Sequence, residues 1–401
     1  MNISLNYKLI VLLFFILSLI YWPVIFSNAK FVTDEIKLIT YLLILLLLSL
    51  KFNKINTYVF ILLFLYFICF LIELYRFDFY LNSISFYGIL FLFLLLFNNL
   101  SQSNEFQEYL ISFWLIISYI IIVFSLIHFC LFAFLSINFD IFNWSESIIN
   151  INRITTDNIS LFGKTTSVMF GEYRVHRLAS YFNEPADFGI FCIINLMIIN
   201  SLTFNKKDYL KNNNLRLLKI LTILAGSLSL SFTFFILLVI ILIRQFSKES
   251  ILKLFIIFLF SVPFIILYFY SLIDLFNISS MSDRLNRMNC GIEYLVNSNT
   301  TQLFFGYGIH NNCNIYLEHL DKFQSYGFSS GYFKILTHRG LLPLLLVIAS
   351  LYLVFKSKLG DFLIFLIIFL VITWHSQYLY LFLMLVLYSS YLKTNYSQQI
   401  K

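Results

Sequence analysis

Long runs of Leu, Ile and Phe recur along the whole chain and restrict what it can fold into. Hydrophobic residues make up 60% of the sequence and charged residues only 12%, a balance that points to a membrane protein. In a bilayer, only α-helices and closed β-barrels satisfy all backbone hydrogen bonds. The runs lack the alternating pattern of barrel strands, and the chain has only 4 prolines and 12 glycines to interrupt them. They therefore predict membrane-spanning helices.

The basic residues between the apolar runs indicate how the helices cross the membrane. Short loops rich in Lys and Arg favour the cytoplasmic side, and placing all of them there gives one consistent topology with both termini in the cytoplasm. The net charge of +7 is explained by these loops and does not indicate nucleic-acid binding. No small-residue cleavage site follows the first run, so we expect a retained helix rather than a signal peptide. The expected spans are twelve: about 9–26, 36–50, 58–74, 84–97, 110–135, 188–204, 217–228, 231–243, 251–272, 340–355, 359–373 and 376–391.

The stretch 217–243 has basic residues on both sides, so this topology requires it to cross the membrane an even number of times. It is long enough for only one long membrane-spanning helix. A short hairpin or a broken pair of helices fits it best, with the break in the small and hydroxyl residues of 225–233. These small residues either allow close helix packing or line a substrate path, and the sequence leaves both readings open.

Two long hydrophilic segments, about 136–187 and 273–339, face the exterior in this topology. They are the only places with room for chemistry, because the rest of the chain is apolar. We expect short amphipathic helices in them, lying on the membrane. The predicted fold is thus an all-α polytopic membrane protein, in which residues 1–401 form a single integral membrane domain with two large exterior loops.

Each exterior segment carries two arginines three residues apart, Arg174 and Arg177 in the first, Arg284 and Arg287 in the second. On a helical turn, this spacing places both side chains on one face. Guanidinium groups stay charged and bind phosphate oxygens in pairs, so one doublet from each segment could clamp a diphosphate. The alternative is that these arginines bind lipid head groups or pair with nearby carboxylates.

Two further polar residues are candidates for proton transfer. Glu184 precedes Pro185, which favours an extended backbone at Glu184 and a helix starting after it. Its carboxylate can then hold Arg177, cap the helix or act as a base, in that order of preference. His310 follows a Gly-x-Gly turn and is either a general base or an ordinary loop histidine.

The cysteines show no metal-ligand spacing, and the chain has no Asp-x-Asp pair of the kind that holds a metal–nucleotide-sugar complex. We therefore expect neither a metal nor another cofactor. Cys290 and Cys313 both lie in the second exterior segment, where an oxidising compartment would allow a disulfide. Two free thiols are an equally good interpretation.

Four short motifs resemble one family of membrane enzymes. They are Arg177-x-x-Ser-x-Phe-x-Glu-Pro185 opening a span, Phe305-Gly-Tyr-Gly308, Ser330-Gly331, and Gly340-Leu-Leu before the tenth span. Together with about twelve helices and two large exterior loops, they resemble the Wzy-type polymerases of O-antigen or capsule repeat units, which are related to the O-antigen ligases.

The resemblance implies a GT-C-like membrane glycosyltransferase at the periplasmic face of the bacterial inner membrane. It would transfer a glycan from undecaprenyl pyrophosphate onto another undecaprenyl-pyrophosphate-linked repeat unit, with a chain-length regulator as a candidate partner. Arg174, Arg177, Arg284 and Arg287 would hold the pyrophosphates, and His310 or Glu184 would handle the proton of the acceptor hydroxyl.

Two other functions remain as alternatives, an O-antigen ligase and a lipid-linked oligosaccharide flippase or other transporter. The ligase shares nearly every one of these features. Two observations argue against a transporter. The halves of the chain show no internal repeat, and the expected spans lack charged residues at their middles.

Overall fold

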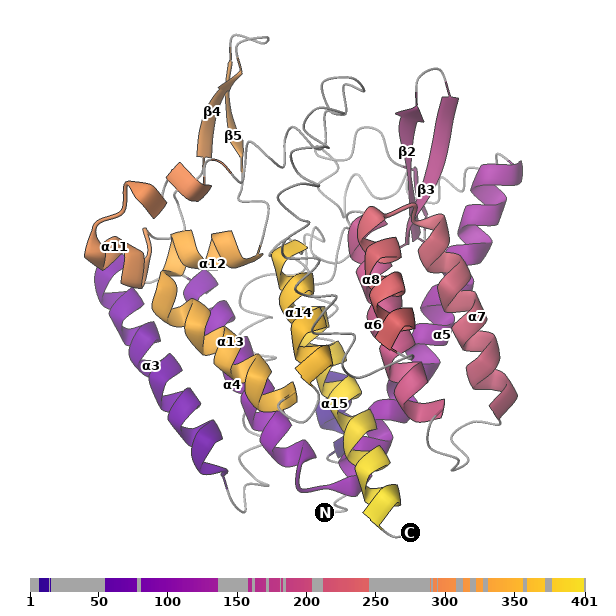
Figure 1. The fold of residues 1–401 in the computed structure, drawn as a ribbon, viewed down its shortest axis with the longest axis horizontal. Coiled ribbons are helices and arrows are strands. Elements are labelled where there is room, and N and C mark those ends of the chain that lie inside the picture. Colours follow the sequence, from indigo (N-terminus) through magenta and orange to yellow (C-terminus); the bar gives the residue numbers. More distant parts are fainter. Residues whose placement is uncertain are drawn as a thin grey trace. The chain divides into compact units, whose positions relative to one another are not determined.

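A computed structural model describes the helices and strands drawn in Figure 1. By its internal packing the chain divides into two compact units. Unit 1 consists of Met1–Leu63, Leu81–Ile236 and His375–Lys401, and unit 2 of Phe64–Tyr80 and Leu237–Trp374. The structure describes residues 7–13, 15, 55–77, 81–135, 158–160, 163–170, 173–180, 182, 185–203, 212–244, 289, 291–293, 295–307, 313–317, 322–326, 331–355, 359–371 and 377–399.

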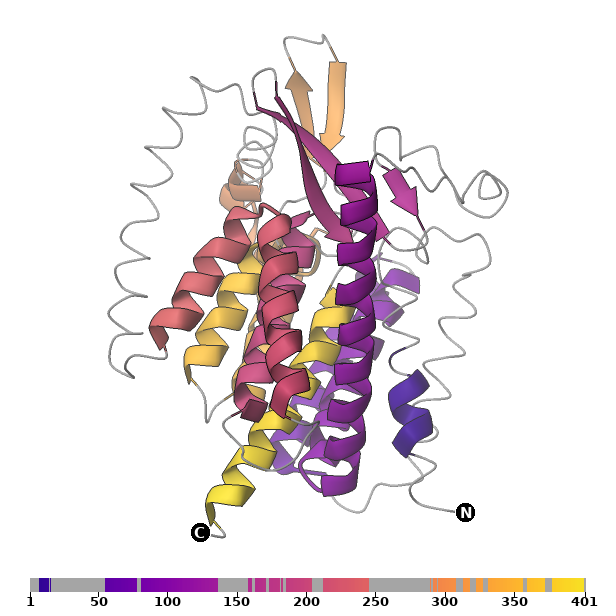
Figure 2. The ribbon, with the colours of Figure 1, turned by 90° about the vertical axis from the view of Figure 1, so that its right-hand side faces the viewer.

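Unit 1 is built around two buried helices, α6 (Pro185–Thr203) and α15 (Gln377–Gln399). These two pack against each other, α15 also packs on α4 (Leu81–Leu100) and α5 (Asn104–Leu135), and α7 (Asn212–Leu228) packs on α6. Helix α6 is apolar on all sides, as expected of a helix enclosed by others, and 94% of its Pro185–Leu202 window is buried. The elements of this unit can be followed in Figure 2.

Hydrogen bonds between side chains fix the helices of unit 1 to one another. The indole of Trp114 donates to the side-chain oxygen of Asn195 over 2.7 Å, which joins α5 to α6. The hydroxyls of Ser201 and Ser390 lie 2.5 Å apart and join α6 to α15. Both pairs are buried, so these two hydrogen bonds form where water is excluded.

Where the structure describes the first exterior segment ahead of α6, it shows strands and not the predicted amphipathic helices. Strands β1 (Asn158–Ser160), β2 (Gly163–Phe170) and β3 (Tyr173–Ser180) form an antiparallel sheet in that order. The residues Thr165-Thr-Ser-Val168 of β2 favour an extended backbone, because β-branched side chains fit a pleated surface. The prediction of an all-α fold is therefore wrong for this segment.

Unit 2 contains α11 (Thr300–Phe305), α12 (Gly331–Arg339), α13 (Leu341–Phe355) and α14 (Leu359–Val371). It also contains the hairpin of β4 (Cys313–Leu317) and β5 (Lys322–Tyr326). Helices α3 (Thr57–Phe77) and α8 (Phe232–Arg244) contribute residues to both units. The second exterior segment thus holds the short helices that were predicted and a hairpin that was not.

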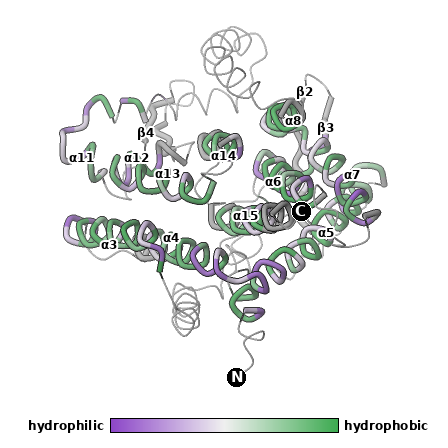
Figure 3. The backbone as a smooth tube through the Cα atoms, turned by 60° about the horizontal axis from the view of Figure 1, so that its bottom comes forward, coloured by the Kyte–Doolittle hydropathy of each residue, from purple (hydrophilic) through white to green (hydrophobic). Residues whose placement is uncertain are grey.

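Three of the described helices are long and apolar enough to cross a membrane, namely Thr57–Arg76, Asn104–Phe134 and Pro185–Leu202. Shorter apolar helices cover Phe86–Leu100, Leu341–Phe355 and Leu381–Leu392, and Figure 3 shows hydrophobic residues along them. These helices support a helical membrane protein. The total of twelve spans stays a prediction, and the spans expected at 36–50 and 251–272 lie outside the described residues.

Candidate functional site

Helices α7 and α8 are separated by a break at residues 229–231, within the stretch where the sequence predicts one. Leu230 in this break has a left-handed backbone with φ of +46°. Small residues let the aromatic ring of Phe234 approach closely: a Cβ added to Gly226 would lie 2.1 Å from the Phe234 ring. A Cβ on Gly189 of α6 would lie 2.9 Å from the Cβ of Phe234. Close packing is therefore one role of these small residues.

Arg177, near the end of β3, points its guanidinium at this break. Its Nε donates to the carbonyl oxygen of Ser229 over 3.2 Å, and its Nη2 donates to that of Leu230 over 3.4 Å. The last carbonyls of a helix carry partial negative charge and lack partners within the helix. A half-buried cation therefore caps the end of α7 and is held in a defined direction.

The residues after Arg177 anchor this arrangement to the core. Ser180 is buried, has a left-handed φ of +54°, and its hydroxyl contacts that of Ser125 on α5. Phe182 is buried against Phe188 and Phe191, with ring centroids 5.8 and 5.2 Å away. Ser180 and Phe182 are thus both anchored to the core shortly before α6 begins.

Helix α6 begins at Pro185, as the sequence predicts. Asp187 lies in its first turn and is only 4% exposed. A carboxylate at this position is stabilised by the positive end of the helix dipole. The sequence analysis did not single out Asp187, although an acidic residue just after a helix-starting proline is a recognisable signal.

Glu184, Arg284, Arg287 and His310 lie outside the described residues. Arg174 is placed as a backbone position in β3, paired with Met169.

The helical spacing predicted for the first arginine doublet is wrong, because positions 174 and 177 belong to a strand. Residues three apart on a strand belong to opposite faces of the sheet. The helical turn on which a shared face of the first doublet was predicted is therefore absent from this segment.

Two of the quoted glycine motifs meet in unit 2. The backbone N–H of Tyr307 donates to the carbonyl oxygen of Thr337 over 2.8 Å. Gly306 has φ of +75°, and a Cβ on it would lie 2.3 Å from the carbonyl oxygen of His338; Gly340 has φ of +90°, and a Cβ on it would lie 2.2 Å from that of Phe304. Both positions require glycine, since the backbones approach too closely for any side chain.

A buried ion pair lies beside this glycine contact. Nη1 of Arg339, at the end of α12, donates to both carboxylate oxygens of Glu73 on α3, at 2.6 Å for Oε2. Arg339 is 5% exposed and Glu73 6%. Lys334 of α12 is also partly buried, and burial together with the charge of Arg339 lowers its pKa to about 8. Sequence analysis missed this cluster, because Glu73 ends an apolar run and its partner is 266 residues away.

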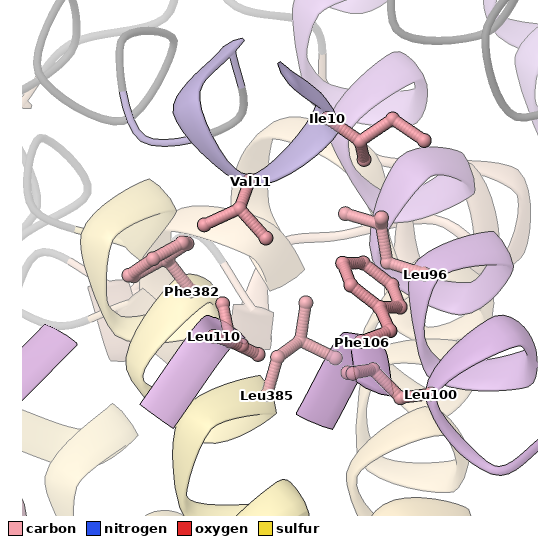
Figure 4. A pocket seen from close by; sticks show the side chains of 8 residues that line it. All are labelled: Ile10, Val11, Leu96, Leu100, Phe106, Leu110, Phe382 and Leu385. Atoms are coloured by element: carbon pink, nitrogen blue, oxygen red, sulfur yellow. The ribbon is translucent and has the colours of Figure 1, made fainter. Parts of the chain in front are cut away.

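A small cavity in unit 1 is unsuited to a polar substrate. Its volume is about 10 Å³, at the lower limit of what one water molecule needs. Aliphatic and aromatic side chains line it (Figure 4): Ile10, Val11, Leu96, Leu100, Phe106, Leu110, Phe382 and Leu385. The candidate functional site is the polar region around Arg177 and the start of α6, where a directed cation and a helix N-terminus occur in one segment.

No group of three or more His, Cys, Asp and Glu side chains suited to a metal occurs among the residues that the structure describes. Cys69, Cys130 and Cys192 are free thiols, whereas the Cys290–Cys313 alternatives depend on Cys290, which lies outside the described part. No known protein family, curated protein or solved structure matches the chain.

Proposed function

We propose that the chain polymerises lipid-linked oligosaccharide repeat units at the periplasmic face of the bacterial inner membrane. The observation that carries this proposal is the position of Arg177, whose guanidinium is held by the carbonyls of Ser229 and Leu230. The same short segment leads directly into α6 at Pro185. A fixed cation beside the start of a helix is suited to a phosphorylated ligand, because helix N-termini also favour anions.

The proposed reaction is a glycosyl transfer between two undecaprenyl-pyrophosphate-linked glycans. The bond between the anomeric carbon of the donor sugar and its pyrophosphate breaks, and a hydroxyl oxygen of the acceptor unit bonds to that carbon. The hydroxyl proton passes to a base, for which His310 and Glu184 are the candidates, and undecaprenyl pyrophosphate leaves. Negative charge develops on the leaving pyrophosphate, and a preorganised arginine stabilises it.

Arg177 is the proposed pyrophosphate contact in the first exterior segment, with Arg174, Arg284 and Arg287 as further candidates. The preferred role of Glu184 is to position Arg177, ahead of capping the helix and of acting as a base. The proposed topology has both termini in the cytoplasm, and the two exterior segments in the periplasm. No cofactor is required, and a chain-length regulator is a candidate partner.

The surface polysaccharide of a deletion strain separates this function from its alternatives. Loss of a polymerase leaves a lipid core that carries one repeat unit. Loss of an O-antigen ligase leaves unmodified core and accumulates lipid-linked polymer, and loss of a flippase traps single units on the cytoplasmic side. Either of the last two results would contradict the proposal.

A further inference from the structure

We infer that Ser125 of α5 is a positioning residue of the proposed reaction and acts on Arg177 through the hydroxyl group of Ser180. The inference rests on the proposed glycosyl transfer, in which Arg177 contacts the leaving pyrophosphate. Ser125 belongs to neither exterior segment, and it is fully buried in a helix that the sequence predicts only as a membrane span. Its hydroxyl group links this helix to the end of the strand that carries Arg177.

The hydrogen bonds of the two serines run in one direction. The Ser125 hydroxyl lies 2.5 Å from the carbonyl oxygen of Ile121 in the same helix and donates to it. A hydroxyl group has one proton, so Ser125 accepts in its contact with Ser180. Ser180 is therefore the donor, and the bonds from Ser180 through Ser125 end on the backbone of α5. Removing the Ser125 oxygen deprives the buried Ser180 hydroxyl of this acceptor.

The backbone at the end of β3 depends on contacts of this kind. Leu178 pairs with Thr165 and Ser180 pairs with Lys164, so β3 has one extra residue, Ala179, between these pairs. Such a bulge bends a strand and changes the direction of its side chains. Ser180, the last residue of the strand, has a left-handed φ of +54°. A residue other than glycine keeps such a backbone only where the surrounding structure holds it, and the bond to Ser125 is one contact that does so.

Two contacts with α5 flank Arg177 in β3. On one side, the ring of His176 packs edge to face with that of Phe132 on α5, with ring centroids 4.9 Å apart. On the other side, Ser180 donates to Ser125. The guanidinium of Arg177 reaches the carbonyl oxygens of the α7–α8 break over 3.2 and 3.4 Å. Both distances are long for N–H···O bonds, so the backbone position contributes strongly to where the guanidinium lies.

The same helix also holds α6, whose start forms the other part of the candidate site. The indole of Trp114 on α5 donates to Asn195 of α6. Trp114 and Ser125 are 11 residues apart, which is close to three full turns and brings both to one side of α5. Helix α5 therefore fixes α6 through one residue and the end of β3 through the other. A displacement of Ser180 along α5 would shift Arg177 relative to α6.

The length of α5 explains how one helix can cross a membrane and also support an exterior strand. It has 32 residues and is therefore about 48 Å long at about 1.5 Å per residue. The hydrocarbon core of a bilayer is only about 30 Å thick. Part of α5 thus extends beyond this layer, and Ser125 lies in the last third of the helix.

Rates of glycan polymerisation in membranes of the deletion strain test the inference. Each variant is expressed at matched levels, and the substrate is the lipid-linked repeat units extracted from that strain. Ser125→Ala should lower the rate at saturating substrate about tenfold, because a small displacement of a positioned group is costly. Ser125→Thr keeps a hydroxyl group that can bond the helix carbonyl, so it should retain most of the rate. The matched control is Ser118→Ala, which should leave the rate unchanged, since Ser118 is a buried residue of α5 whose hydroxyl donates to Leu115 in the same helix.

An Arg177→Ala background separates the positioning of Arg177 from a general loss of folding. In this background Ser125→Ala should change the remaining rate less than about twofold, because the residue on which Ser125 acts is absent. Equal rates for the parent protein and Ser125→Ala would overturn the inference, and so would the same tenfold loss in both backgrounds. A parent protein that forms no glycan ladder from these units would instead overturn the proposed function, and the inference with it.

Discussion

Nε of Arg177 lies 3.2 Å from the carbonyl oxygen of Ser229 and donates a hydrogen bond to it. This contact ties the last residues of β3 to the break between α7 and α8, 52 residues further along the chain. The guanidinium is thereby directed by the fold before any ligand arrives. Preorganisation of this kind is what stabilises charge that develops in a transition state.

Replacing Arg177 tests whether a positive charge alone at this position is sufficient for the proposed activity. Arg177→Ala should lower glycan polymerisation by about 100-fold or more, as expected for loss of a preorganised donor. Arg177→Lys should restore little activity. A guanidinium can contact two carbonyls and a phosphate through its planar fork of donors, and an ammonium group has no such fork. Glycan ladders from membranes with matched protein levels give the measurement. Full-length ladders from Arg177→Ala would contradict the proposed role, and Arg216→Ala on the exposed face of α7 serves as the control.

The backbone at Leu230 predicts a stabilising substitution. Its φ of +46° is unfavourable for a residue with a Cβ, and its side chain is 44% exposed, so little packing would be lost. Leu230→Gly should raise the free energy of unfolding by about 1 kcal/mol. The matched control is Leu224→Gly, at a position 49% exposed inside α7, which should lower it by about 1 kcal/mol. Thermal unfolding of the two variants should therefore shift in opposite directions, and a lower midpoint for Leu230→Gly would refute the expectation.

Local chemistry accounts for what could be predicted from the sequence. The start of α6 at Pro185 follows from the fixed φ of proline, and the break near 225–233 follows from small residues in a stretch too short for two full spans. Arg174 and Arg177 show the limit of such reasoning. Their spacing fits a helix face, but pairing with β2 makes that segment a strand, and propensity alone does not reveal a pairing partner.

Contacts between distant segments could not be predicted at all. Glu73 lies near the end of the apolar helix α3, and Arg339 ends the short helix α12. Nothing in the sequence around either residue indicates that the other is its partner. The two glycines at 306 and 340 were recognised as motifs, yet their mutual packing depends on backbone geometry that appears only in three dimensions.

Breaking the Glu73–Arg339 pair should destabilise the protein strongly. Glu73→Ala or Arg339→Ala alone should lower the free energy of unfolding by about 3–5 kcal/mol, because each leaves a buried charge without its partner. The double variant should lose much less than the sum of the two single losses. Unfolding midpoints of all four proteins measure this coupling, and additive losses would show that the pair is not coupled.

Lys334 predicts an unusual pH dependence of stability. Its pKa is 10.5 in the unfolded chain and about 8 in the folded protein. Below pH 8 both states are protonated and the folded state bears the full cost of the buried charge. Between these two pKa values only the unfolded lysine keeps its proton, so this residue's contribution to stability rises with pH.

Lys334→Met removes this cost, so the variant should be more stable than the parent near neutral pH, by about 1 kcal/mol or more. The advantage should shrink as the pH is raised through the window from 8 to 10.5. Unfolding midpoints of both proteins across this range provide the measurement. A constant difference would mean that the charge of Lys334 does not titrate in the folded protein as described.

The glycine contact of unit 2 predicts two further losses of stability. A Cβ at position 306 would lie 2.3 Å from the His338 carbonyl oxygen, and one at position 340 would lie 2.2 Å from that of Phe304. Gly306→Ala and Gly340→Ala should each lower the free energy of unfolding by at least about 2 kcal/mol, since a left-handed backbone alone costs about 1–2 kcal/mol and the overlap adds to it.

The Gly340→Ala substitution should also disturb the Glu73–Arg339 ion pair, because Arg339 is the neighbour of Gly340 and its position depends on the same backbone. Gly340→Ala should therefore weaken the energetic coupling between Glu73 and Arg339, measured by repeating the four-protein comparison in that background. Leu345→Ala, on the exposed side of α13, is the control and should leave the coupling intact. Unchanged coupling in Gly340→Ala would mean that the glycine contact and the ion pair are independent features of unit 2.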